Sequence, residues 1–207
     1  MKKMIVVAAA MLLACATSFA QFNFNLGYVN SVETTKVNSD KYASGLNGFT
    51  AGFGYALELA DDFYFTPGVN YVFITGSSAE NFGGVLSLKG DVTEQYVNIP
   101  LTLSYDYEIS RGAKLFVFAG PTASLGLTSS TKVTANILGY AKDTKVDNYK
   151  DDDYKRFDVM VGGGAGLKLN DSYGIKVGYD YGLLNRSANT NAPTHRAQLT
   201  VALTYLF

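Results

Sequence analysis

Eight stretches of this 207-residue sequence carry apolar side chains at every second position. In residues 197–207 the odd positions are Ala, Leu, Val, Leu, Tyr and Phe, while the even positions from 198 to 204 are Gln, Thr, Ala and Thr. Successive side chains of a β-strand point to opposite faces, so this alternation predicts strands with one apolar face. The pattern is least clean in residues 113–127, where both faces are apolar near the start. The predicted strands are residues 22–30, 48–59, 63–74, 97–107, 113–127, 157–169, 173–183 and 197–207.

The connections between these strands alternate between short and long. Three short turns are predicted at residues 60–62, 110–112 and 170–172. Four longer, polar connections separate the other pairs, at residues 31–47, 76–90, 128–155 and 185–195. This alternation is typical of an antiparallel up-and-down meander with both chain ends on the side of the short turns.

A meander of this kind has two open edges unless the first strand pairs with the last. In lipid an open edge leaves backbone groups without hydrogen-bond partners, so closure is required. We therefore expect an all-β fold, an eight-stranded antiparallel up-and-down transmembrane β-barrel, with Phe207 at the inner interface. The alternative is a secreted soluble barrel with its apolar face inward. The second face here is mostly Gly, Ala, Ser, Thr and Asn, which suits a crowded lumen better than a solvated surface.

Aromatic residues provide a separate indication, because in a membrane barrel they gather at both edges of the apolar band. The expected lower girdle is Phe22, Phe63, Tyr105, Tyr107, Tyr173, Tyr205 and Phe207, and the expected upper girdle is Tyr28, Phe49, Phe73, Phe157 and Tyr181. Four aromatic residues fall between the two girdles, namely Phe53, Tyr55, Tyr71 and Tyr179.

The amino-terminal residues indicate export. Residues 1–20 begin with two lysines, continue with an apolar run and end on the small-x-small sequence Ser-Phe-Ala, which predicts a signal peptide at 1–20 and a mature barrel domain at 21–207. The single cysteine, Cys15, excludes an internal disulfide. Its setting, "LLAC", loosely matches a lipidation sequence, and this alternative processing route stays open.

The stretch "QYVNIPLTLSY", residues 95–105, resembles the outer-membrane β-barrel domain family common in Bacteroidota, which includes the PorT-like proteins. The resemblance rests on Tyr96, the alternating apolar residues after it and the Ile-Pro-Leu step at 99–101. Further similar stretches are "FVFAGPTASLGL", "RFDVMVGGGAGLKL", "GYDYGLLN" and the final aromatic residue. The resemblance implies an eight-stranded outer-membrane barrel similar in architecture to OmpX and the OmpA transmembrane domain. It implies no role in type IX secretion.

No motif in the sequence predicts a catalytic, cofactor-binding or metal-binding residue. Barrel enzymes that deacylate lipid A need a histidine with a serine and a carboxylate, but no serine is in step with His195, which we expect to be a solvated loop residue. The acidic run 151–153 lacks the spaced ligands of a calcium loop. The glycines of "VGGGAG", residues 161–166, open no helix, so they do not form a dinucleotide fingerprint. We expect them to make room inside the barrel or to let it bend.

Charged residues on the inward face form two predicted levels. The lower level is Glu58, Lys114, Lys168 and Lys176, and the upper level is Glu94, Asp158, Asp180 and Arg196. Eight strands enclose little more than side chains, so these groups are expected to pair with one another and not to line a pore.

The sequence thus predicts a non-enzymatic protein of the cell outer membrane that presents four extracellular loops, for binding, adhesion or envelope structure. A small-solute channel and a lipid-acting enzyme are the alternatives. The expected partners are outer-membrane lipid and an extracellular or envelope partner held by the loops, chiefly residues 128–155. With 17 basic and 18 acidic residues, nothing points to nucleic acid. We expect a monomer.

Overall fold

The computed structural model describes residues 20–37, 40–82, 86–137, 140–151, 154–188 and 192–207. The predicted leader, including Cys15, lies outside the described residues except for Ala20, where the first strand begins. Within the described part of the chain, no helix is long and apolar enough to cross a membrane. The described strands are β1 (Ala20–Val37), β2 (Asp40–Ala60), β3 (Phe63–Phe82), β4 (Leu86–Ser110), β5 (Ala113–Ile137), β6 (Tyr140–Asp147), β7 (Phe157–Leu169), β8 (Tyr173–Gly182) and β9 (Thr194–Leu206).

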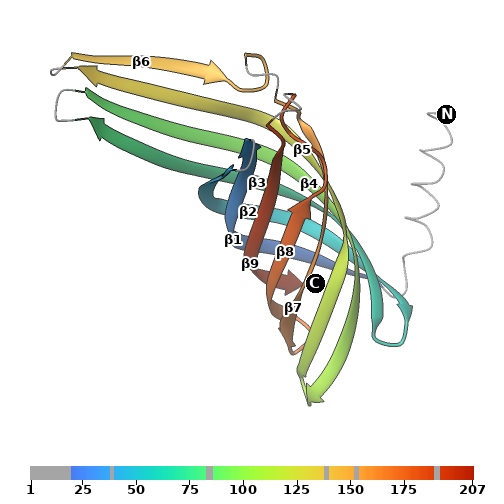
Figure 1. Ribbon diagram of the computed structural model, residues 1–207. Coiled ribbons are helices and arrows are strands. Elements are labelled where there is room, and N and C mark those ends of the chain that lie inside the picture. Colours follow the sequence, from blue (N-terminus) through green and yellow to red (C-terminus); the bar gives the residue numbers. More distant parts are fainter. Residues whose placement is uncertain (1–19, 38–39, 83–85, 138–139, 152–153, 189–191) are drawn as a thin grey trace.

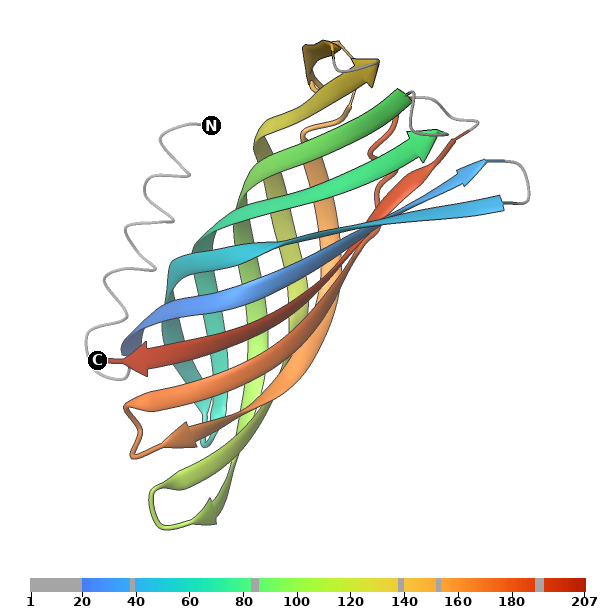
Figure 2. The same ribbon diagram turned by 90° about the vertical axis from the view of Figure 1, so that its left-hand side faces the viewer.

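Eight of these strands form a closed antiparallel ring in the order β1, β2, β3, β4, β5, β7, β8, β9 (Figure 2). The ring closes between β1 and β9, where Leu26 pairs with Leu203 and the amide of Phe207 donates to the carbonyl of Phe22 over 2.9 Å. The expected eight-stranded barrel and its closing strand are confirmed. We call the end that holds Ala20, Phe207 and the short turns the lower end, and the opposite end the upper end.

Each predicted short turn contains a residue with a positive φ angle. Asp62 joins β2 to β3, Gly112 joins β4 to β5, and Asn170 with Asp171 joins β7 to β8. Asp, Asn and Gly tolerate this conformation better than other residues, so local chemistry places the turns where the sequence indicated.

The apolar face of each strand lies outside. In β1 the outward Phe22, Leu26 and Tyr28 are about half exposed, whereas the inward Asn23 and Asn25 are buried. Outside a closed barrel this apolar band is stable only against lipid, so the barrel spans a membrane. Of the aromatic residues between the girdles, Tyr71 pairs with Ala51 and Tyr179 with Gly163, so each ring stands beside a small neighbour.

The inward glycines of β7 and β8 make room for the rings of β5. A Cβ atom added at Gly164 would lie 2.7 Å from the Phe118 ring, and one at Gly166 would lie 2.3 Å from the Phe116 ring. This explains why both faces of β5 are apolar: Leu115 and Val117 meet lipid while the two phenylalanines fill the lumen.

The strands continue far beyond the predicted bounds at the upper end. Residues 31–47 were expected to be a polar connection, but they form paired strands from Ser31–Leu46 up to Val37–Asp40. The upper parts of β3, β4 and β5 likewise continue and, with β6, form a four-stranded extension, residues 75–82, 86–95, 128–137 and 140–147, which we call the blade (Figure 1). The polar side chains of these residues indicate contact with water, but they do not exclude strands, because antiparallel pairing is equally possible in water.

Candidate functional site at the upper mouth of the barrel

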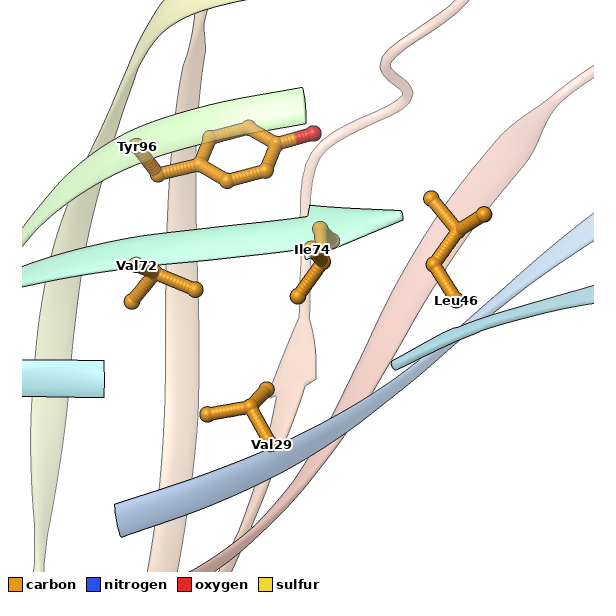
Figure 3. Close-up of a cluster of buried hydrophobic side chains, with 5 residues drawn as sticks. All are labelled: Val29, Leu46, Val72, Ile74 and Tyr96. Carbon is orange, nitrogen blue, oxygen red and sulfur yellow. The ribbon is translucent and has the colours of Figure 1, made fainter. Parts of the chain in front are cut away.

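An apolar cluster fills the upper half of the lumen. It consists of Val29, Leu46, Val72, Ile74 and Tyr96, each no more than 4% exposed. Figure 3 shows these five side chains gathered inside the strands. Close-packed apolar side chains leave little space for water, so this cluster separates the upper mouth from the lower lumen.

Arg186 lies directly at this level, although it belongs to the connection between β8 and β9 and not to a strand. Its side chain is 1% exposed and forms an ion pair with Glu33 of β1. A second nitrogen, Nη2, donates to the hydroxyl of Tyr96 over 2.7 Å and lies 3.7 Å from a carboxylate oxygen of Glu94. Glu94 also accepts hydrogen bonds from Tyr96 and, over 2.6 Å, from Ser129. One arginine from a connection therefore neutralises two lumen carboxylates.

Two tyrosines of the 148–156 connection make contacts with charged groups at the upper mouth. The hydroxyl of Tyr154 donates to Glu33 over 2.8 Å, and its ring lies 4.8 Å from the Arg186 guanidinium. The Arg156 guanidinium lies 4.4 Å from the ring of Tyr149. Burial, followed by the charge of Glu94, raises the pKa of Tyr154 and raises that of Tyr149 to about 12, so both hydroxyls stay protonated.

A backbone hydrogen bond joins the two connections, since the amide of Lys155 donates to the carbonyl of Arg186 over 2.8 Å. The 148–156 connection also pairs with β5, through the amide of Asn148 and the carbonyl of Ser129 at 3.0 Å. The barrel and the described parts of the two connections therefore cover the upper mouth. Residues of this assembly also line a cavity of about 300 Å³, whose lining is Glu33, Ser44, Leu46, Val92, Glu94, Thr131, Asn148, Tyr154 and Ser187.

The predicted upper charges lie in the lumen as expected, but their partners differ from the prediction. Arg196 is fully buried and donates to Ser124 over 2.7 Å, with its guanidinium 4.1 Å from the Tyr96 ring. Asp158 is buried and accepts the amide of Leu184 over 3.2 Å. The expected pairing among these charges is wrong, because the cation that meets Glu94 is one that comes from a connection.

The lower charges also find partners outside the predicted set. Lys168 pairs with Asp106 at 2.5 Å, and Lys114 pairs with Asp171 of the β7–β8 turn at 3.3 Å. Asp106 was not recognised in the sequence, although it is inward and only 2% exposed. Lys176 forms no ion pair with another described residue, and its ammonium group lies 5.9 Å from the centre of the Phe118 ring.

His195 was expected in a solvated loop, but it lies in β9. It is half-buried, its ring stacks on Tyr181 at 5.9 Å, and its Nδ1 lies 3.1 Å from the carbonyl oxygen of Gly182. Asp151 caps a turn by accepting the amide of Asp147, and the other two residues of the acidic run lie outside the described residues. Among described residues, no group of three or more His, Cys, Asp or Glu side chains is arranged to hold a metal ion.

Sequence reasoning missed Arg186 and Glu33 because both lie in stretches without periodicity. One signal was present. The predicted upper level holds three carboxylates against one arginine, an imbalance that calls for a further cation in a lumen of low polarity. Arg186 meets this need from the neighbouring connection.

Comparison with known proteins assigns the chain to a family. Residues 16–187 match the family model described as Outer membrane protein beta-barrel domain. No curated protein matches the sequence. A solved structure of Ail, the attachment invasion locus protein of Yersinia pestis, in complex with the heparin analogue sucrose octasulfate, is similar over 91% of this chain and 99% of its own, with 14% identity and a TM-score of 0.49.

Two further solved structures are similar at comparable levels. Neisserial surface protein A (NspA) is similar over 89% of this chain and 97% of its own, with 13% identity and a TM-score of 0.44. The outer membrane enzyme PagL is similar over 86% of this chain and 98% of its own, with 9% identity and a TM-score of 0.40.

Proposed function

The chain belongs to the outer membrane protein beta-barrel domain family, and within it we propose a non-enzymatic barrel that binds a partner outside the cell through its strand extensions. As a member of this family the chain is a protein of the cell outer membrane. In our proposal the upper end faces outward, because outer-membrane barrels place their short turns in the periplasm and their longer connections outside. The finer similarity to PorT-like proteins, based on Tyr96 and the step at 99–101, is part of the same proposal.

The blade is the observation that carries the proposal. Among the described residues, β3 pairs only with β4 from Gly76 to Phe82, and β6 pairs only with β5, so both blade edges present unpaired backbone groups. Such edges readily accept another polypeptide. Ion pairs order one face of the blade, with Lys132 and Asp143 at 2.7 Å and Lys89 and Asp91 at 3.0 Å.

The closed mouth supports binding more than transport. The apolar cluster and Arg186 occupy the level through which a solute would pass, and the same groups fix the connections beside the blade. A preorganised surface loses less conformational entropy when a partner binds. For a lipid-acting enzyme the support is weaker, since the described contacts of His195 are with Tyr181 and the Gly182 carbonyl.

The test compares two truncations that follow cross-strand pairs. In the blade variant, residues 76–92 and 131–146 are each replaced by Asn-Gly, which joins strands that already lie opposite each other. In the control variant, residues 35–42 are shortened in the same way. Both changes keep the ring and the five residues of the apolar cluster. The blade variant also removes Val92, which packs against that cluster, and Thr131, which donates to Asn148, so its folding is verified before the comparison.

Each tagged variant is crosslinked on intact cells and recovered after its folding is verified by heat-modifiable gel mobility. We expect a partner to be recovered with the full chain and the control variant, and lost with the blade variant. Equal recovery with both truncations would exclude the blade as the binding surface. Single-channel steps from the full chain, with no crosslinked partner, would favour the channel instead.

A further inference from the structure

A second cavity of about 150 Å³ occupies the lower half of the lumen. About half of its lining residues carry amide or hydroxyl groups, and Phe116 and Phe118 contribute to its apolar part. Its upper lining includes Asn98, two residues below Tyr96 on β4, and Gln198, two residues below Arg196 on β9. Its lower lining includes Lys168, two residues from the β7–β8 turn. The chamber therefore lies between the upper lumen and the lower end of the barrel.

Two opposite charges in this chamber form no direct ion pair or hydrogen bond with another described residue. Lys176 and Asp180 both line the chamber from β8. They attract each other, and Asp180 also attracts Arg196, but only through longer-range electrostatics. Four residues along a strand correspond to about 13 Å between their Cα atoms, too far for direct pairing without strong bending of both side chains. By contrast, Lys168 at the bottom of the chamber pairs with Asp106 at 2.5 Å.

An unused acceptor stands beside Asp180. Gln198 pairs with Asp180 across β8 and β9, is 5% exposed, and its side-chain carbonyl oxygen accepts no hydrogen bond from any described residue. Its amide nitrogen is already used, since it donates to Thr200 over 3.2 Å. Buried charges and acceptors without partners are costly, so this end of the chamber favours a group with several N–H donors and a positive charge.

We infer that the chamber is a binding site for a small zwitterion with separated charges. Its ammonium group donates to Asp180 and to the free oxygen of Gln198, and its carboxylate accepts from Lys176. A cavity of about 150 Å³ holds a molecule the size of benzene, so the ligand has roughly six to nine non-hydrogen atoms. An ω-amino acid or a dipeptide meets both requirements of size and charge spacing.

The test is calorimetric titration of the folded, detergent-solubilised full chain with 4-aminobutanoate and glycylglycine, against acetate and methylammonium. We expect saturable binding of the zwitterions and much weaker binding of the single charges. Lys176→Met and Asp180→Asn should each weaken zwitterion binding roughly tenfold or more, the effect of losing one charge-assisted hydrogen bond. Lys114→Met, whose lysine pairs with the exposed Asp171, is the matched control and should bind as the unaltered protein does.

The most discriminating variant exchanges the two charges, Lys176→Asp with Asp180→Lys. The zwitterion can bind this double variant in the opposite orientation, so binding that each single change removes should be restored. If the exchanged protein does not fold, as judged by heat-modifiable mobility, Lys176→Met and Asp180→Asn decide alone. No heat with any probe, or equal binding by both single variants and the control, would mean that the chamber holds only solvent and would overturn the inference.

Discussion

Replacement of Arg186 by methionine should destabilise the barrel strongly, because it leaves two carboxylates in the lumen without their cation. Glu94 is 2% exposed, and its other described contacts are hydrogen bonds from Tyr96 and Ser129. Glu33 is 16% exposed and keeps the hydrogen bond from Tyr154. Removing one partner of a buried ion pair costs about 3 to 5 kcal/mol. Since Glu33 reaches water, we expect the lower end of that range for the free energy of unfolding.

The measurement is urea unfolding in lipid vesicles, followed by heat-modifiable gel mobility. A compensated variant, Arg186→Met with Glu33→Gln and Glu94→Gln, should recover most of the loss, because neutral groups in a buried ion-pair site are often tolerated. Trypsin should also cleave the 148–156 connection faster in Arg186→Met, since Tyr154 loses the guanidinium beside its ring. A loss below about 1 kcal/mol in the single variant would refute the reasoning, as would a compensated variant less stable than the single one.

Three further outcomes are expected. Val177→Arg, at a lipid-facing site midway along β8, should cost roughly 2 to 4 kcal/mol, whereas Thr200→Arg in the lower chamber should cost less; equal folding yields on gels would mean that the faces are reversed. Planar-bilayer recordings should show no stable single-channel steps, and reproducible steps would contradict the closed upper lumen. The hydrogen bond from Lys132, then that from Thr134, lowers the pKa of Asp143, so its contribution to blade order is present above the ordinary aspartate pKa and is lost as the pH falls through the lowered one. In an NMR titration Lys132→Gln should raise that pKa, and an unchanged value would count against this ion pair.

The sequence alone determined the barrel. The alternation of apolar side chains, the three short turns and the apolar last strand are local features of the sequence. A closed ring is the arrangement in lipid that satisfies the backbone groups of these strands. The inward placement of Glu94, Asp158 and Arg196 followed from the same alternation. The strand extensions were missed because their polar side chains resemble those of a loop. Their pairing depends on a neighbouring strand, and amino-acid composition carries no information about that neighbour.

Which charges meet could be seen only once the chain was folded. Arg186 lies more than 90 residues after Glu94 and most of the chain after Glu33. It also belongs to a connection without periodicity. Lys168 forms an ion pair with Asp106, whereas Lys176, eight residues further along, forms no ion pair with a described residue. Alternation states which face a side chain occupies, but the partner across a lumen depends on strand stagger, on the course of the connections and on the space that glycines leave. These are properties of the closed ring, and no single strand carries them.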